Sequence, residues 1–195
     1  MTEAPARAPG RPRDPQVDEA IVDATLALLT EEGFDRLSMD AVAARAGVGK
    51  ATIYRRWPSK EALVIDAVAR RSDPLPVVPD GGVRERLVAL LEGILATSRT
   101  GVGRLLPCMV GATVTNPTLA HHYRQQIMAP RRERVRDFLR TGVADGELRP
   151  DLDVDLAVDC VVGPLLYRIV FAGDSPVQPG DCGRLVDAVL RGLAP

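Results

Sequence analysis

The chain has 195 residues, of which 46% are apolar, 26% charged and 4% aromatic. This length suits one domain, or two small domains that share a core. The composition excludes a largely disordered chain, a collagen-like repeat and an aromatic-rich β-sandwich. Lys and Arg number 25 against 26 Asp and Glu, so the formal net charge is −1. A polycation that binds nucleic acid through bulk charge is therefore excluded, whereas a local basic surface is not.

The sequence also predicts the compartment and the absence of metal chemistry. Residues 1–16 lack the apolar segment of a signal peptide, and the most apolar stretch, 154–171, contains three charged side chains that favour a buried helix over a membrane span. We expect a cytoplasmic protein with no membrane segment, no metal and no cofactor. The cysteines lack the spacing of a zinc site or a disulfide framework; they are Cys108, Cys160 and Cys182.

Helical periodicity extends over nearly the whole chain. Residues 1–14, rich in Pro, Ala and Arg, predict a flexible basic arm. A Pro- and Gly-rich linker at 74–82 separates an N-terminal domain at 15–73 from a C-terminal domain at 83–195. No run alternates with period two, so we expect an all-α fold. About nine helices are predicted, at 15–32, 39–46, 50–56, 59–71, 83–99, 103–115, 117–143, 152–171 and 181–193.

Local residues predict where several of these helices begin and end. Gly33 is expected to stop the first helix, because glycine readily adopts the left-handed conformation at a helix end. Ser38 and Ser59 are predicted N-caps of the second and fourth helices. Pro130 is expected to kink or split the long helix at 117–143.

Residues 38–57 have the spacing of a helix-turn-helix, in which two short helices flank a turn of about three residues that contains glycine. Gly47 can adopt the positive φ that the sharp reversal needs. Small and apolar residues occupy the inner positions, which are Val42, Ala43, Ala46, Val48 and Ile53. The second helix of such a motif lies in the major groove of DNA. Its outward positions here are Lys50, Ala51, Thr52, Tyr54 and Arg55.

Charge supports this interpretation. Five cations and no acid lie between Arg45 and Lys60, whereas residues 1–44 contain nine acids and four bases. The alternative is a solvated basic helix face that binds nothing. The combined pattern of turn, inner apolar positions and charge favours DNA binding over that alternative.

The run from Ala43 to Leu63, AARAGVGKATIYRRWPSKEAL, closely resembles the DNA-binding domain of the tetracycline-repressor (TetR) family. The upstream segments 31–34 and 38–43 resemble the family as well, so the resemblance covers about residues 15–70. It implies an all-α homodimer that binds palindromic operators, usually as a repressor. It also implies a C-terminal domain in which a small molecule releases the protein from DNA.

The resemblance implies roles for individual residues. Lys50, Thr52 and Tyr54 match recognition-helix positions, while Ser38 and Lys60 match helix-start positions near phosphates. Many members carry Ser or Thr where this chain has a glycine at position 49, so a contact through that side chain is ruled out here. Trp57 is expected to pack in the core against the first or fourth helix. The predicted DNA-contacting set is Ser38, Lys50, Ala51, Thr52, Tyr54, Arg55 and Lys60.

The C-terminal half offers candidates for a ligand pocket and for a dimer interface. Methionine and aromatic side chains suit an adaptable apolar pocket, although core packing explains each of them equally well; they are Met109, Tyr123, Met128, Phe138, Tyr167 and Phe171. The helix at 152–171 is apolar on more than one face, so we expect it and 181–193 to form a four-helix bundle with a second copy. The predicted interface residues are Leu156, Val161, Leu165, Leu166, Ile169, Leu185 and Val189.

Two weaker patterns receive a structural interpretation. The basic run at 131–136 with Arg140 is interpreted as a solvated helix face, because Glu133 and Asp137 are interspersed in it. His121 and His122 are adjacent, so they point to different sides of a helix and do not form a metal-binding pair.

The preferred hypothesis is a ligand-responsive transcriptional regulator without catalytic activity, a repressor that a small apolar molecule releases from a palindromic operator. We expect the effector to move the helix at 59–71. The alternative is a small-molecule carrier or an enzyme on an all-α scaffold; the cation placement and the lack of a recognisable catalytic motif argue against it. A third hypothesis is an architectural nucleic-acid binder without a ligand, for which a C-terminal part of more than 110 residues is too large.

Overall fold

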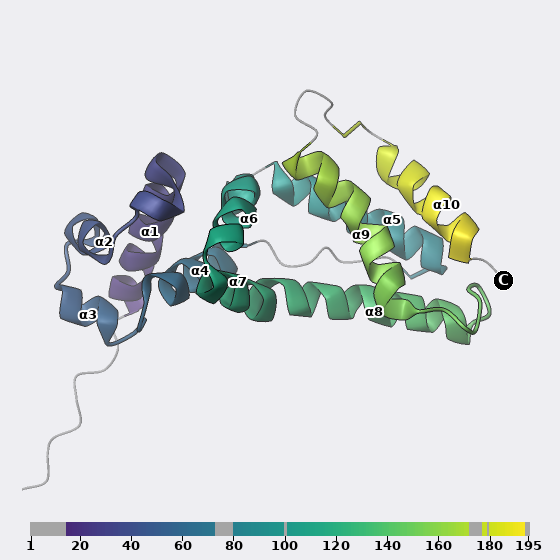
Figure 1. Cartoon of the computed structure of the whole chain (residues 1–195), viewed down its shortest axis with the longest axis horizontal. Helices are drawn as coiled ribbons and strands as arrows, with labels where there is room; N and C mark the ends of the chain where they lie inside the picture. The colour runs from purple at the N-terminus through teal and green to yellow at the C-terminus, as the bar shows by residue number, and fades with distance from the viewer. Residues whose placement is uncertain (1–14, 73–79, 100, 172–176, 179, 194–195) are drawn as a thin grey trace, which may run out of the picture.

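The computed structural model describes residues 15–72, 80–99, 101–171, 177–178 and 180–193. Within these ranges the chain forms helices and no strand, which confirms the predicted all-α class (Figure 1). The predicted arm at 1–14 and most of the predicted linker lie outside the described residues. The elements are α1 (Pro15–Arg36), α2 (Met39–Ala46), α3 (Lys50–Tyr54), α4 (Lys60–Arg71), α5 (Val83–Ser98), the 3₁₀ turn η1 (Gly101–Leu105), α6 (Leu106–Thr115), α7 (Pro117–Tyr123), the π-helical turn η2 (Arg124–Met128), α8 (Ala129–Ala144), α9 (Val154–Val170) and α10 (Asp181–Leu193).

The predicted helix boundaries in the N-terminal part depend on local signals. Gly33 has φ 80° and ψ 174°, which breaks the helical backbone of α1 where the stop is predicted. The Ser38 and Ser59 side chains accept hydrogen bonds from the amides of Ala41 and Ala62, at 3.1 and 3.2 Å, so both predicted caps are confirmed. These caps satisfy amides that have no partner within the helix.

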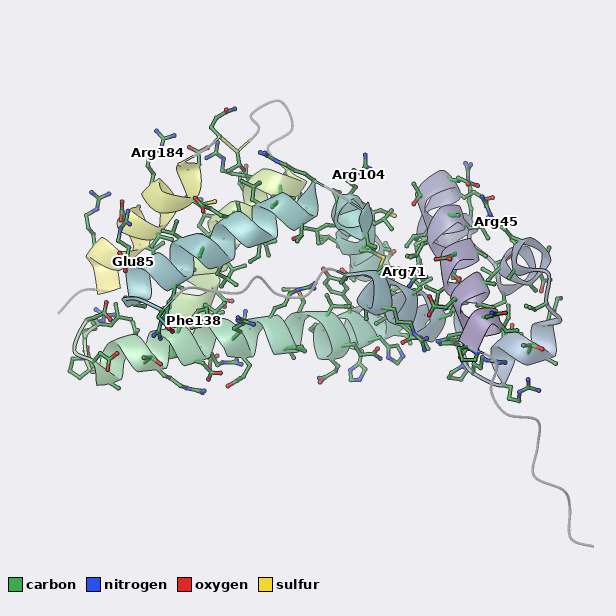
Figure 2. The ribbon with its side chains drawn as sticks, turned by 180° about the vertical axis from the view of Figure 1, so that it is seen from behind. Arg45, Arg71, Glu85, Arg104, Phe138 and Arg184 are labelled. Atoms are coloured by element: carbon green, nitrogen blue, oxygen red, sulfur yellow. The ribbon has the colours of Figure 1, made fainter. Side chains whose placement is uncertain are left out.

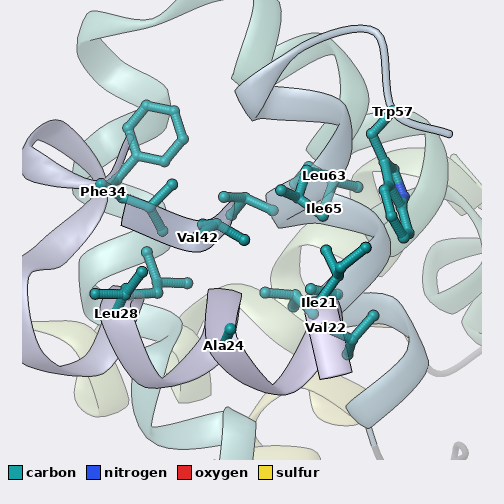
Figure 3. Close-up of a cluster of buried hydrophobic side chains, with 14 of the residues drawn as sticks. Ile21, Val22, Ala24, Leu28, Phe34, Val42, Trp57, Leu63 and Ile65 are labelled. Atoms are coloured by element: carbon teal, nitrogen blue, oxygen red, sulfur yellow. The ribbon is translucent and has the colours of Figure 1, made fainter. Parts of the chain in front are cut away.

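The N-terminal helices enclose a core of aliphatic side chains, shown in Figure 3. Ile21 and Val22 of α1 meet Val42 of α2 and Leu63 of α4, and all four are fully buried. Each such side chain contributes about 1.5–3 kcal/mol of hydrophobic stabilisation relative to an exposed one. We call this cluster the first core; it holds α2 and α3 in a fixed position on α1 and α4.

The first core continues beyond the predicted linker. Leu105, Met109, Leu119 and Ile127, from η1, α6, α7 and η2, are buried in the same cluster as the α1–α4 side chains. In Figure 1, α6 and α7 lie between the N-terminal helices and the remaining bundle. The elements that follow the linker are therefore in direct packing contact with those that precede it.

The long helix predicted over 117–143 is split, as the position of Pro130 predicts. Pro130 is the second residue of α8 and has no amide hydrogen to donate to the preceding turn. That turn, η2, widens into a π-helical conformation between α7 and α8. The split gives ten α-helices among the described residues where about nine are predicted.

Helices α5, α8, α9 and α10 form a second core at the other end of the molecule. It contains Leu87 and Leu91 of α5, Leu139 of α8 and Val158 of α9, all of which are fully buried. Figure 1 shows α9 crossing α8 with α10 beside α5. The two cores leave the space between α4, α6, α8 and α9 for the cavity described below.

Candidate nucleic-acid interface and ligand cavity

Helices α2 and α3 form the predicted helix-turn-helix. Gly47 has φ 66°, a left-handed conformation that costs glycine little, and the Val48 amide donates to the Ala43 carbonyl at 3.0 Å. Gly49 precedes α3 in an extended conformation and provides no side-chain cap. The turn thus has the geometry that residues 47–49 predict.

Helix α3 has a buried face and an outward face. Ile53 is fully buried and Trp57, just beyond the helix, is 5% exposed, so these side chains fix α3 to the first core. The helix ends at Tyr54, two residues earlier than predicted, because the amides of Arg56 and Trp57 both donate to the Ile53 carbonyl. The predicted DNA-contacting residues of α3 lie on the outward face, where Lys50, Ala51, Tyr54 and Arg55 are exposed and Thr52 is half-buried.

The concentration of positive charge is weaker in the fold than the sequence window indicates. Arg45 forms a bidentate pair with Glu31 of α1, with N–O distances of 2.5 and 2.7 Å, and this hydrogen bonding lowers the pKa of Glu31. Lys50 lies 2.5 Å from Asp40 of α2. The five cations of this window therefore do not form a purely basic surface, because folding brings acids from the preceding helices against Arg45 and Lys50.

The remaining cations of the window differ in their surroundings. Arg56 pairs with Asp18, and its Nη1 donates to the Thr52 carbonyl at 3.1 Å, so it serves the packing of α3 on α1. Lys60 donates from Nζ to the Phe34 carbonyl at 3.0 Å and stands over the Phe34 ring. Arg55 is exposed and has no ion pair with any described residue. It is the cation of this window most available to a phosphate.

Helix α3 is tied to α4 through Trp57. The indole Nε1 donates to Asp66 Oδ2 at 2.8 Å, and the same oxygen accepts from Arg70 Nε at 2.8 Å. The prediction that Trp57 packs in the core against a neighbouring helix is therefore confirmed. This hydrogen bond joins α4 directly to the segment that follows α3.

A cavity of about 460 Å³ lies between α4 and the C-terminal helices, within the size range of small-molecule sites. Five of the six predicted ligand-contacting side chains line it, namely Met109, Tyr123, Met128, Tyr167 and Phe171. The prediction for Phe138 is wrong. That ring packs against the second core under the Arg134 guanidinium, in the part of α8 beside the start of α5 (Figure 2), because α8 extends beyond the cavity.

Sequence reasoning misses several side chains of the cavity wall. Val68 and Ser72 of α4 line it, as do Arg131, Arg132 and Asp159. The solvated-face interpretation of the basic run fits Arg140, which is exposed and pairs with Glu133 and Asp137, whereas Arg136 is half-buried and pairs with Glu133 and Asp155. Their neighbours at 131 and 132 differ because they lie at the start of α8, beside the cavity.

The predicted dimer residues fall into two groups. Val161 and Leu165 are 1% and 0% exposed in the second core, so the prediction that they contact a second copy is wrong; they face the protomer's own interior. Leu156 is 61% exposed. The other members are partly buried: Leu166 lines the cavity, while Ile169, Leu185 and Val189 pack against the second core.

An apolar stripe is exposed along α9, and its members Gly163, Tyr167 and Phe171 also line the cavity. Leu156, Cys160, Gly163, Tyr167 and Phe171 recur at spacings of four, three, four and four residues, and all are exposed. Tyr167 and Phe171 are 63% and 68% exposed, and their ring centroids are 5.9 Å apart. Exposed apolar side chains that recur on one face of a helix are candidates for contact with a partner.

Comparison with known proteins establishes the family. Residues 21–67 match the model of bacterial regulatory proteins of the tetR family, and residues 77–189 match that of the tetracyclin repressor-like C-terminal domain. The HTH-type transcriptional regulator YdeS of Bacillus subtilis strain 168 is 36% identical over 166 residues, 85% of this chain and 84% of that protein. The chain belongs to the TetR family of transcriptional regulators.

Further TetR-family relatives match along most of their length. The DNA-binding transcriptional repressor TetR of Mycobacteroides abscessus is 32% identical over 88% of this chain and 90% of its own. The crystal structure of the TetR family transcription regulator SCO0332 has a TM-score of 0.71 and 36% identity, and covers 92% of this chain and 100% of that one. The resemblance stated from residues 43–63 is therefore confirmed, as are the all-α TetR fold and the role in transcription regulation.

Other expectations concern absences. Within the described ranges no group of three His, Cys, Asp or Glu side chains could hold a metal ion. None of the helices that the structure describes is both long and apolar enough to cross a membrane. The cytoplasmic location stays a prediction, as does the identity of the side chains that touch DNA.

Proposed function

We propose that this TetR-family regulator is a homodimeric repressor that reads an inverted repeat with α3 and releases it when a small, largely apolar molecule occupies the cavity. The observation that carries the proposal is the division of α3 into two faces. Ile53 is sealed in the first core, while Lys50, Tyr54 and Arg55 are held outward on a helix of fixed orientation. A groove-binding helix needs this arrangement.

The salt bridge between Lys50 and Asp40 does not prevent Lys50 from contacting DNA. The Lys50 and Asp40 side chains are 58% and 64% exposed, and exposed ion pairs contribute little to stability. A phosphate can therefore replace Asp40 as the partner of Lys50 at small cost. The half-buried Thr52 hydroxyl is suited to a base edge or a thymine methyl, and Tyr54 to a phosphate or a base.

Dimerisation through the apolar stripe on α9 supplies the second reading head. Leu156, Tyr167 and Phe171 are the exposed apolar side chains that a second copy would cover. A two-fold interface of α9 and α10 from each protomer forms a four-helix bundle, as the composition of these helices predicts. Two recognition helices related by a two-fold axis bind half-sites about one helical turn, roughly 34–36 Å, apart, or further if the heads are splayed.

Helix α4 connects the cavity to the reading head. Its Val68 and Ser72 line the cavity, and its Asp66 accepts the hydrogen bond of Trp57. An occupant that displaces α4 therefore reorients α3. Such a molecule regulates DNA binding only if it binds the displaced conformer more tightly than the DNA-bound one.

The test is binding to DNA enriched from a random library on the purified protein. The wild type is expected to bind the enriched duplex as a dimer, and Lys50→Ala to bind both enriched and random DNA more weakly. Arg140→Ala on α8 is the matched control, since it removes an exposed cation far from α3. Failure to enrich any sequence, or equal binding by Lys50→Ala and the wild type, would contradict the proposal.

A further inference from the structure

The cavity wall contains more positively charged than negatively charged side chains. Arg131, Arg132 and Asp159 line the cavity, and Arg132 pairs with Asp159 in an ion pair that joins α8 to α9. Arg131 has no carboxylate partner among the described residues. Its Nη1 lies 3.5 Å from the Ile127 carbonyl, at the outer limit of a hydrogen bond. The described wall thus carries one uncompensated positive charge.

A hydrogen-bond donor faces the same space. Tyr123 of α7 is half-buried and lines the cavity, and its hydroxyl forms no hydrogen bond with any described residue. Removal from water raises the pKa of Tyr123, and the positive charge of Arg131 partly opposes this rise. The phenol is therefore protonated near neutral pH and can donate its hydrogen. Tyr123 and Arg131 together offer donors to one acceptor group.

The rest of the wall is mainly apolar. Its members include Leu90, Ile94, Met109, Val158, Val162 and Val170. A cation half-removed from water beside such a surface is unfavourable unless an anion pairs with it. The cavity wall is therefore complementary to a ligand with one anionic end and one apolar end.

We infer that the cavity takes an amphipathic monoanion, an apolar body with a carboxylate or similar oxyanion head held by the Arg131 guanidinium and the Tyr123 hydroxyl. A guanidinium can donate two parallel hydrogen bonds to such a head, which gives orientation as well as affinity. This inference rests on the proposed function, because it specifies the chemistry of the molecule that occupies the same cavity.

A pair of fluorescent probes with one aromatic skeleton separates charge from shape. 1-Anilinonaphthalene-8-sulfonate carries an oxyanion head, and N-phenyl-1-naphthylamine lacks it. We expect the full-length wild type to bind the sulfonate more tightly than the neutral amine. Decanoate is expected to displace the sulfonate at lower concentration than 1-decanol does.

Variants assign the preference to one side chain. Arg131→Gln is expected to weaken sulfonate binding about 10- to 100-fold, the range for a lost charged hydrogen-bond pair, and to leave binding of the neutral amine within about twofold. Arg131→Lys is expected to retain most of the preference. Arg140→Gln on the same helix is the control for surface charge and is expected to change neither probe.

The outcomes separate this inference from the proposed function. The inference of an anionic ligand is overturned if the wild type binds both probes with equal affinity, or if Arg131→Gln keeps the preference for the sulfonate. Either result is compatible with a neutral effector and so does not contradict the proposed function. If none of the four compounds binds, that is, neither of the two probes and neither decanoate nor 1-decanol, the cavity is not a ligand site. The ligand response of the proposed function then fails together with this inference. DNA binding measured without any probe tests the reading head separately.

Discussion

Arg55 and Arg56 are neighbours in the sequence with opposite surroundings, so they form a matched pair of substitutions. Arg55 is exposed and has no described ion-pair partner. Arg56 and its partner Asp18 have side-chain exposures of 10% and 18%. We therefore expect Arg55→Ala to lose DNA affinity at unchanged stability, and Arg56→Ala to lose stability first.

The size of each effect follows from the environment. A phosphate contact contributes about 0.9 to the slope of log K against log salt, so a dimer that lacks both Arg55 side chains loses about 1.8. At about 0.15 M salt this corresponds to roughly fivefold per contact and about 30-fold for two. Arg56→Ala leaves the Asp18 carboxylate buried without its partner, which costs about 3 kcal/mol of unfolding free energy and about 6–12 °C in Tm.

The assay is fluorescence anisotropy of a labelled enriched operator at several salt concentrations, with Tm measured for each variant. Arg55→Ala is expected to stay within about 2 °C of the wild type, as a surface substitution does. If Arg55→Ala leaves the salt slope unchanged, or if Arg56→Ala melts at the wild-type temperature, the assignment of these two side chains is refuted.

Three further predictions test the reading head, its attachment to α4 and the dimer. Asp40→Asn removes the acid beside Lys50, so anisotropy is expected to show DNA binding a few-fold tighter; weaker binding would contradict the phosphate role of Lys50. Trp57→Phe deletes the 2.8 Å hydrogen bond to Asp66 and is expected to lower the urea-derived unfolding free energy by about 1–2 kcal/mol, whereas unchanged stability would mean the bond does not hold α3 on α4. Tyr167→Asp is expected to convert the dimer into a 21.0 kDa monomer in light scattering, and a persistent dimer would place the interface elsewhere.

Features decided by nearby residues could be predicted from the sequence. The serine caps at 38 and 59, the reversal at Gly47 and the break before Pro130 each depend on a few consecutive residues. Their physical causes are a side-chain acceptor near free amides, freedom of φ and a missing amide hydrogen. The same local character makes the helix-turn-helix of residues 38–57 recognisable.

Features that depend on residues distant in the sequence could not be predicted from the sequence. Lys50 and Arg56 look uncompensated in the sequence because their partners come from α2 and α1. Val161 and Leu165 are as apolar as Leu156, and composition does not say that the first two face the protomer's interior while the third faces out. The role of Arg131 in the cavity wall depends likewise on where α8 begins relative to α4 and α9.

The most direct test of α3 as the reading helix is to sequence the DNA that wild type and Thr52→Ala each enrich from a random library. The wild type is expected to enrich an inverted repeat. Thr52→Ala is expected to enrich the same repeat with discrimination reduced at one symmetry-related position in each half-site, at a cost of about 1–3 kcal/mol on the wild-type operator. A wild-type motif without two-fold symmetry, or identical motifs and affinities for the two proteins at equal Tm, would contradict the account.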